Sequence, residues 1–551
     1  MHTDHLSQAP FNLDPAAMSW VRETFGQMSR DAKLRQLFTL LSAGDDPETI
    51  ARQQAFRPGG ITRMRGSDAA RERQIIDGFN AKGAVPLLVS ADLEGSRMSL
   101  SSGQEWPNPL ALAAIDDLEV TETVSRMMAE EARAAGINWS FTPVLDINAA
   151  WRSPIVATRG FGSDPEVIAR HALSQMKMFQ RHGIASAVKH WPGEGHDDRD
   201  QHLVTTINPL SMDEWEATFG RLYRRAIEAG VLSVMSAHIA LPAFVREQMG
   251  DDAGVEAFRP ASISRLLNEE LLRKRLGFNG LIVSDATGMA GLGAWSKRSE
   301  HLPEVIASGC DVILFSNDPE QDLQYLDAAL ADGRLSWECV DEAVLRQLGM
   351  KAALGLHGTA ELPRRTDVET AKAYADDVAR RAPTLVKDVQ GLLPLDPGKH
   401  SRVLVFSGGI VFPFLPDPLP FVLPQLLAEK GFEITVYEPG IEVSAKRFDL
   451  ILYLFGDETL LTRGRIFLDW LGLTGHFGAA MARHWHEIPT LMISFGYPYL
   501  LYDAPRAPAY INAYSTTETM QRAVADLLTG EGEWNRNSPV DPFCGLGDAR
   551  Y

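Results

Sequence analysis

Short apolar runs rich in strand-forming residues recur along the first two thirds of the chain, separated by stretches with helical periodicity. Alternation of this kind is typical of a parallel sheet whose strands are joined by helices. The runs number eight, which is the number of strands that closes a barrel. We expect these strands at Gln36–Leu41, Gly60–Met64, Pro86–Asp92, Trp139–Asp146, Ala185–His190, Leu232–His238, Leu281–Asp285 and Asp311–Phe315.

A change of pattern near residue 356 predicts a domain boundary. Helical periodicity runs from Leu335 to Leu356, and a polar stretch with Gly358 and Pro363 follows it. New strand-like runs then alternate with helices at Arg402–Phe406, Ile434–Tyr437, Leu450–Phe455, Thr490–Phe495 and Ala509–Tyr514. We therefore expect an α/β protein with an N-terminal (β/α)₈ TIM-type barrel (1–356), a linker and connecting helix (357–384), and a smaller open α/β sandwich domain (385–551).

Ionisable residues close five of the eight expected barrel strands. A single Asp after a strand is most often a helix cap or a turn residue. In a barrel of this type, however, the carboxyl ends of all strands meet at one mouth, where active sites lie. Five such endings together predict a site at that mouth: Asp92, Asp146, His190, His238 and Asp285.

Composition narrows the range of partners. The formal net charge is −19 and no basic run occurs, so we exclude nucleic acid as a partner and expect an uncharged one. Apolar residues make up 45% and charged residues 23%, as in folded soluble proteins. The 3 cysteines show no C-x-x-C spacing, which argues against disulfides and against a cysteine metal site.

No segment has the character of a membrane span or a signal peptide. The most apolar candidate, Gly408–Leu427, contains Pro413, Pro416, Pro418, Pro420 and Pro424 and cannot form a regular helix. Residues 1–18 lack an apolar stretch of signal-peptide length. We expect a cytoplasmic protein that does not bind a membrane. The Pro-rich segment after Gly408 either makes a dimer contact or approaches the pocket.

The densest chemistry lies between Lys189 and His202. Pro192, Gly193 and Gly195 exclude a helix, so the polar groups lie on a loop that follows a strand. Asp200 and His202 are two residues apart and can meet through one hydrogen bond. The carboxylate would then fix the imidazole tautomer and leave the other ring nitrogen free to exchange a proton.

This loop also carries a resemblance to a known family. Lys189–His202 (K-H-W-P-G-E-G-H-D-D-R-D-Q-H) resembles, without a gap, the K-H-F-P-G-H-G-D-T-x-x-D-S-H loop of glycoside hydrolase family 3, in its β-N-acetylglucosaminidase branch. Three segments, A-D-L-E-G-S-R, R-G-F-G-S-D-P and L-I-V-S-D, are similar to further motifs of that family, and Ala513–Leu528 resembles the last helix of its second domain. The resemblance covers about residues 30 to 530.

The resemblance implies a retaining exo-glycosidase that hydrolyses terminal β-linked N-acetylglucosamine, or a related β-sugar, without cofactor or metal. Asp285 would form a covalent glycosyl-enzyme, and an Asp200–His202 dyad would serve as acid and base. The substrate would be a cell-wall fragment or a chitin-type oligosaccharide. The implied sugar-binding residues are Asp92, Arg159, Lys189, His190 and His238.

Some positions depart from the family pattern and leave the sugar open. Leu100 stands where an Arg is usual, Glu194 and His196 stand where His and Asp are common, and Ala286 replaces an acidic residue. A β-glycosidase of different sugar specificity is therefore one alternative. A phosphorylase is another, because a neutral imidazole does not repel an anionic acceptor as a carboxylate would.

Two alternatives come from other functional classes. One is a metal-dependent hydrolase that uses the ligand-type residues of the loop, which are His190, Glu194, His196, Asp197, Asp198, Asp200 and His202. No H-x-x-x-H helix or Cys ligand supports it. The other is a sugar-binding protein without catalysis, against which the presence of Asp285, Asp200 and His202 argues.

Overall fold

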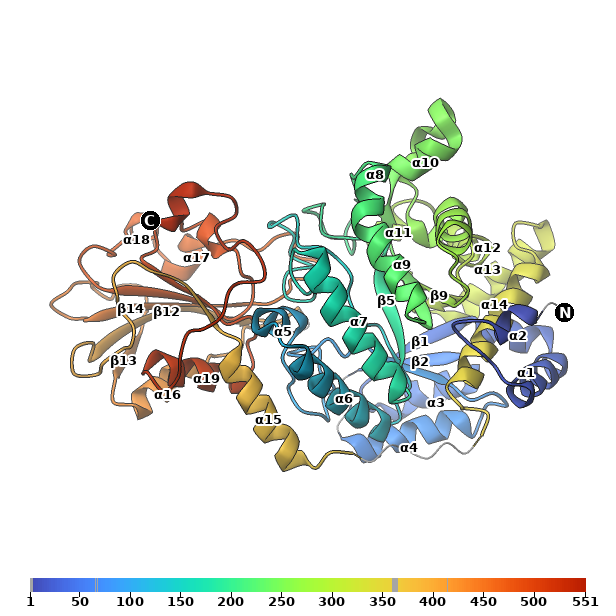
Figure 1. The fold of residues 1–551 in the computed structure, drawn as a ribbon, viewed down its shortest axis with the longest axis horizontal. Coiled ribbons are helices and arrows are strands. Elements are labelled where there is room, and N and C mark those ends of the chain that lie inside the picture. Colours follow the sequence, from blue (N-terminus) through green and yellow to red (C-terminus); the bar gives the residue numbers. More distant parts are fainter. Residues whose placement is uncertain (1–2, 65, 67, 359–364, 414) are drawn as a thin grey trace.

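A computed structural model describes residues 3–64, 66, 68–358, 365–413 and 415–551. The chain forms two bodies side by side (Figure 1). The N-terminal body is a barrel surrounded by helices, and the C-terminal body is built on an open sheet. Residues 359–364, within the expected linker, lie outside the described residues, and helix α15 (Val368–Arg381) follows them. The expected domain boundaries stay a prediction.

The first body is a closed barrel of eight parallel strands, in the order β1-β10-β9-β7-β5-β4-β3-β2. Each expected run contributes one strand, so the predicted fold class is confirmed. The strands are β1 (Phe38–Ala43), β2 (Gly60–Met64), β3 (Leu88–Ala91), β4 (Trp139–Ser140), β5 (Ala185–Trp191), β7 (Ser233–Ser236), β9 (Leu281–Ala286) and β10 (Val312–Leu314). A further pair, β6 (Thr206–Ile207) and β8 (Ile239–Ala240), forms a small sheet beside it.

Of the described barrel strands, only β2 has the predicted bounds, and β4 and β1 differ most from theirs. The ladder of β4 ends at Ser140, because Pro143 has no N–H to donate to a neighbouring strand. The chain nevertheless stays beside β5, since the Leu145 N–H donates to the Lys189 carbonyl at 2.7 Å and carries Asp146 to the mouth. Strand β1 starts two residues later than expected, because helix α2 (Arg30–Gln36) runs through Gln36.

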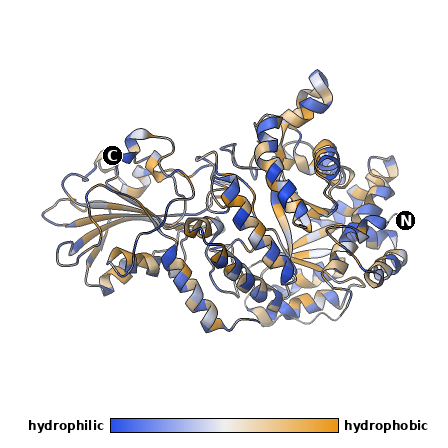
Figure 2. Ribbon diagram, in the orientation of Figure 1, coloured by the Kyte–Doolittle hydropathy of each residue, from blue (hydrophilic) through white to orange (hydrophobic). Residues whose placement is uncertain are grey.

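Helices cover the outside of the barrel, with polar faces outward and the apolar strands inside (Figure 2). Strands β3, β5 and β7 are buried along their whole length. The helices of this body are α1 (Pro15–Gln27), α2, α3 (Pro47–Phe56), α4 (Ala69–Asn80), α5 (Pro109–Ile115), α6 (Leu118–Ala134), α7 (Pro165–Arg181), α8 (Met212–Trp215), α9 (Arg221–Glu228), α10 (Pro242–Met249), α11 (Ala290–Gly293), α12 (Arg298–Ala307), α13 (Pro319–Asp332) and α14 (Trp337–Ala353).

The second body holds a six-stranded sheet in the order β11-β16-β15-β14-β12-β13. Its five parallel strands are those predicted: β12 (Arg402–Val411), β13 (Glu433–Val436), β14 (Leu450–Asp457), β15 (Thr490–Ser494) and β16 (Ala509–Asn512). The sixth, β11 (Thr384–Asp388), was not predicted and pairs antiparallel with β16. The helices are α16 (Leu423–Glu429), α17 (Trp470–Thr474), α18 (Phe477–Met481) and α19 (Glu518–Leu528).

The segment Gly408–Leu427 is not a continuous helix, as its prolines predict. It ends β12, turns, and enters α16. Among the described residues, no helix combines the length and the apolar character needed to cross a membrane.

Candidate active site

A cavity of about 290 Å³ opens at the carboxyl ends of the barrel strands. Six of the eight predicted site residues line it: Asp92, Arg159, Lys189, His190, His202 and Asp285. The other two, Asp200 and His238, lie directly behind its wall. The structure therefore brings together residues that are up to 193 positions apart in the sequence, from Asp92 to Asp285.

Asp285 is the penultimate residue of β9, at the mouth of the barrel. Its Oδ1 accepts a hydrogen bond from the Ala286 N–H at 2.7 Å. Burial opposes its ionisation, but His238, His190 and His202 surround it and hold its pKa below the ordinary value. Asp285 is therefore an anion at neutral pH, aimed at the cavity, which is the state that a nucleophile requires.

His202 faces the same cavity from the loop after β5. Its Nδ1–H donates to Asp200 Oδ1 at 2.7 Å, as the spacing of the two residues predicted. The His202 N–H donates to the same oxygen at 2.8 Å, so the contact is a tight turn and not an extended strand. Burial opposes ionisation of Asp200, but the hydrogen bonds and charge of His202 lower its pKa. The Nε2 of His202 is thereby left to exchange a proton at the cavity.

Four charged groups form a largely buried network in the cavity wall. Lys189 Nζ contacts Glu94 Oε1 at 2.6 Å and Asp92 Oδ1 at 3.2 Å. Arg159 binds the same Glu94 through two N–H groups, at 2.8 and 2.9 Å. Burial opposes ionisation of Glu94, yet Arg159 and Lys189 hold its pKa far below the ordinary value. Such fixed donors and acceptors are suited to binding the hydroxyl groups of a polar ligand.

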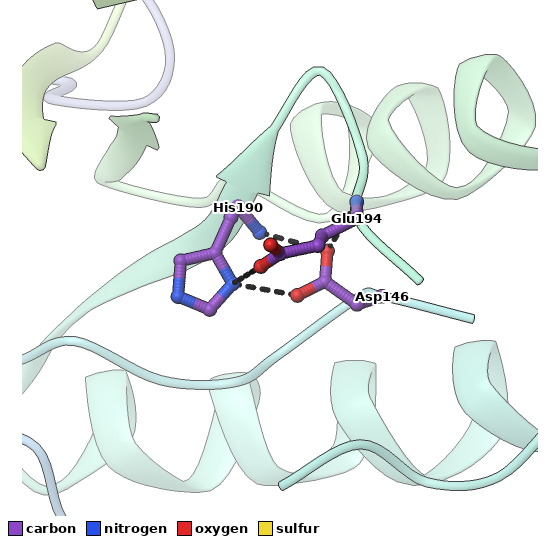
Figure 3. Close-up of side chains that lie close together, drawn as sticks. All are labelled: Asp146, His190 and Glu194. Carbon is purple, nitrogen blue, oxygen red and sulfur yellow. Dashed lines mark hydrogen bonds and ion pairs between the residues drawn. The ribbon is translucent and has the colours of Figure 1, made fainter. Parts of the chain in front are cut away.

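His190 is held by two carboxyl groups (Figure 3). Its Nδ1–H donates to Asp146 Oδ2 at 2.6 Å, and Glu194 Oε2 lies 3.8 Å from the same nitrogen. Burial lowers the pKa of His190, which favours the neutral ring, and its Nε2 lies 3.4 Å from Nη2 of Arg159 in the cavity wall. Burial and the charge of Asp146 raise the pKa of Glu194 well above its ordinary value, which favours its protonated form.

These three residues also bring ligand atoms within 4.8 Å of one another. The arrangement differs from the predicted metal site, because it includes Asp146 and omits His202. Within the described part of the chain, the remaining loop residues of that hypothesis do not join it. Asp146 Oδ2 already accepts the proton of the ring nitrogen that would have to bind a metal. The geometry is that of a His–Asp pair.

His238 occupies a supporting position and does not line the cavity. Its Nε2–H donates to the Ala286 carbonyl at 3.0 Å, and its Nδ1 pairs with Ser262 Oγ at 2.8 Å. Both ring nitrogens are thus engaged by the protein, and the sequence-based expectation that His238 binds a sugar is not supported. Burial lowers the pKa of His238, consistent with a neutral ring that braces the backbone next to Asp285.

The sequence did not identify the residues that complete the cavity. Val411, the last residue of β12, lines it together with Phe412 and Pro413, so the Pro-rich segment approaches the pocket. Thr459 and Leu461 line it as well, from the segment after β14. Each of these segments follows a parallel strand of the second domain, where loops collect at the carboxyl edge of the sheet.

Glu458 joins the two domains at the rim of the cavity. Its Oε1 accepts hydrogen bonds from Ser96 Oγ at 2.7 Å and from the N–H and hydroxyl of Thr516 at 2.7 and 2.5 Å. Burial raises the pKa of this carboxyl group. Glu94 and Glu458 are the two acidic residues that sequence reasoning missed. Glu94 lies inside the A-D-L-E-G-S-R motif, whereas no local signal marked Glu458.

Comparison with known proteins identifies the family of this chain. The chain matches the glycosyl hydrolase family 3 N-terminal domain over residues 45–349. It is 37% identical to a β-N-acetylglucosaminidase/β-glucosidase of Cellulomonas fimi, over 98% of this chain and 99% of that protein. A β-hexosaminidase of Methylobacillus flagellatus is 29% identical over 50% of this chain and 76% of its own length.

Two solved structures are similar over nearly the whole chain. A β-glucoside phosphorylase, BglX, superposes with a TM-score of 0.91 at 34% identity, covering 100% of both chains. A family 3 β-N-acetylglucosaminidase from Paenibacillus sp. has a TM-score of 0.78 at 23% identity, covering 94% of this chain and 100% of that one, and shares the fold. The barrel, the sheet domain and the matched segments agree, and the chain belongs to glycosyl hydrolase family 3.

Proposed function

We propose that this enzyme removes a terminal β-linked glucose or N-acetylglucosamine residue with retention of configuration. One observation carries the proposal: Asp285 and His202 line the same cavity, and His202 is bonded through Nδ1 to the buried Asp200. An anionic carboxylate and an oriented imidazole supply a nucleophile and an acid/base. A cavity of about 290 Å³ suits a single sugar ring, which favours an exo mode of attack.

The reaction would take two displacements. In the first, an Asp285 oxygen bonds to the anomeric carbon, the glycosidic bond breaks, and Nε2–H of His202 protonates the leaving oxygen. In the second, His202 takes a proton from water as the water oxygen attacks the anomeric carbon, and the Asp285 ester bond breaks. Lys189, Asp92 and Arg159 would hold the ring hydroxyls throughout. The natural donors would be cell-wall fragments or chitin-type oligosaccharides.

Phosphate is a second candidate acceptor, favoured by the similarity to BglX over the full chain. After the first step His202 is neutral, and hydrogen phosphate can approach it without the repulsion that a carboxylate base would exert. Hydrogen phosphate needs no general base, because it already carries a nucleophilic oxygen. Its attack would release Asp285 and form a sugar 1-phosphate with the original β configuration.

A panel of aryl β-glycosides, assayed with and without phosphate, tests both the proposed sugar donor and the proposed acceptor. We expect turnover of the glucoside or the N-acetylglucosaminide, and NMR detection of the retained β product. An inverted product, or no turnover of any β-glycoside, would contradict the donor half. A rate and product composition unchanged by phosphate would leave water as the acceptor and exclude phosphorolysis.

A further inference from the structure

A segment of the second domain reaches into the mouth of the barrel beside the proposed acid/base. It follows β14, and its Leu461 side chain lines the cavity. The Leu460 N–H donates to the Pro154 carbonyl of the barrel at 3.2 Å. Two residues further on, the Thr462 N–H donates to Asp200 Oδ2 at 2.8 Å. The carboxylate that orients His202 is therefore held from both domains.

The contact fixes an otherwise rotatable carboxylate. Asp200 is only 1% exposed, so protein groups take the place of water around it. Its Oδ1 accepts two hydrogen bonds from His202, and its Oδ2 accepts the bond from Thr462. With a donor on each oxygen, the carboxylate cannot turn about its Cβ–Cγ bond without leaving a buried acceptor unpaired.

Thr462 contributes its backbone and not its side chain. Its side chain is exposed, and no hydrogen bond of its hydroxyl occurs among the described residues. Its φ of 66° lies in the left-handed region, which is rare for a β-branched residue. Strain of this kind persists where the surroundings impose it, and it marks candidate functional positions. Here the unusual turn directs the amide at Asp200.

We propose that the backbone amide of Thr462 is a positioning group for the acid/base, so that the Asp200–His202 dyad is assembled only when the second domain is docked. This inference rests on the function proposed above. Loss of the amide would leave Asp200 Oδ2 buried without a donor. Asp200 would rotate or take up water, and His202 would lose both its orientation and the anion that stabilises its protonated form. The nucleophile and the sugar-binding network would be unaffected.

Thr462→Pro tests the proposal, because proline has no N–H and cannot adopt a φ of 66°. We expect kcat/KM for a glycoside with a poor leaving group to fall by about 10- to 100-fold, the range expected when a general acid is misplaced. Activity on a dinitrophenyl glycoside, which needs no protonation, should fall less than about threefold. Arg463→Ala, at the exposed next position, controls for general disturbance of the segment and should change neither rate. Equal losses on both substrates would overturn the proposal.

A double variant separates the amide from other effects of the proline. In a His202→Ala background, Thr462→Pro should lower kcat/KM for the glycoside with a poor leaving group by less than about a further twofold. The reason is that both changes act on one proton transfer. A full additional loss would place its effect elsewhere and overturn the proposal. If His202→Ala itself spares poor leaving groups, the proposed function fails instead, which distinguishes the two failures.

Amide hydrogen exchange gives a readout that does not depend on folding of the proline variant. In the unmodified enzyme, the Thr462 amide should exchange slowly although its side chain is exposed, since its proton is bonded to a buried carboxylate. In Asp200→Ala the same amide should exchange at least about tenfold faster. Equally fast exchange in both proteins would show that the bond does not persist in solution and would overturn the proposal.

Discussion

The two halves of the cavity are built on different principles. The barrel half carries charge: Asp285, the Asp200–His202 pair and the network around Glu94 all come from strand ends or from the loops that follow them. The half supplied by the second domain is mostly apolar, as at Val411 and Leu461, apart from Glu458 at the rim, and it reaches Asp200 through a backbone amide. On the proposed function, the chemistry belongs to the barrel, while the second domain completes the cavity wall and would hold the acid/base in place.

The largest effect should come from removing the nucleophile of the barrel half. Asp285→Ala removes the carboxylate that we propose as the nucleophile, and we expect kcat to fall by at least about 10³-fold. Circular dichroism and thermal melting serve as controls for folding. Added azide should partly restore turnover and give a product of inverted configuration. Retained activity without an added nucleophile would move the chemistry away from Asp285.

His202→Ala should separate the two chemical roles within the barrel half. If His202 donates the proton to the leaving oxygen, as we propose, His202→Ala should lower kcat/KM about 10²-fold on poor leaving groups and less than about fivefold on dinitrophenyl glycosides. Rates measured over a series of leaving groups check this. Equal losses across the series would contradict the acid/base assignment. Asp200→Asn should follow the same trend with a smaller loss.

Glu194→Gln, also in the barrel half, tests how a buried carboxyl group affects stability rather than catalysis. Because the folded-state pKa of Glu194 is raised, its contribution to stability is fully present below the unfolded pKa of about 4.3 and falls as pH rises from there towards the folded pKa. Glutamine cannot ionise. The margin between the free energies of unfolding of the variant and the parent should therefore shift in favour of the variant between about pH 5 and pH 8, by up to about 1.4 kcal/mol per pH unit.

Melting curves at several pH values measure this margin. The exposed Glu228→Gln provides the matched control and should show no such trend. A margin that stays constant with pH, or narrows as pH rises, would mean that Glu194 is ionised in the native protein.

The smallest effect should come from the apolar half. Leu461→Ala shortens one contact of the wall without touching a charged group, and we expect KM to rise about threefold with kcat nearly unchanged. Steady-state kinetics on one aryl glycoside measure it. A fall in kcat larger than the rise in KM would show that this wall affects the reaction itself. It would contradict the assignment of the chemistry to the barrel half alone.

The parts of the site that sequence reasoning found are those whose position follows from the fold. His190 and Asp285 end barrel strands and Asp92 directly follows one, so their place in the sequence fixes their place at the mouth. Asp200 and His202 are neighbours in sequence, and their contact is local. Glu94 was missed because it comes two residues after Asp92, in a loop whose path no pattern predicts.

The parts that were missed depend on how two domains meet. Glu458 and Leu461 follow a correctly predicted strand of the second sheet, yet nothing in their own sequence indicates that they reach the barrel. Strand β11 was missed for another reason. It is a short edge strand ending in Lys387 and Asp388, without the long apolar run that marks a central strand. Packing between the two domains brings Glu458 and Leu461 to the barrel, and pairing with β16 makes β11 a strand. Local propensity reveals neither.

The network around Glu94 has a consequence for which sugars can enter. Its two carboxylates, Asp92 and Glu94, are matched by two cations, Lys189 and Arg159, so the four groups sum to zero charge. A hexuronic acid or a sialic acid would bring a carboxylate into a region already neutral, and would lose its hydration without gaining an unpaired cation. We therefore expect the electroneutrality of this network to favour uncharged pyranosides over acidic sugars.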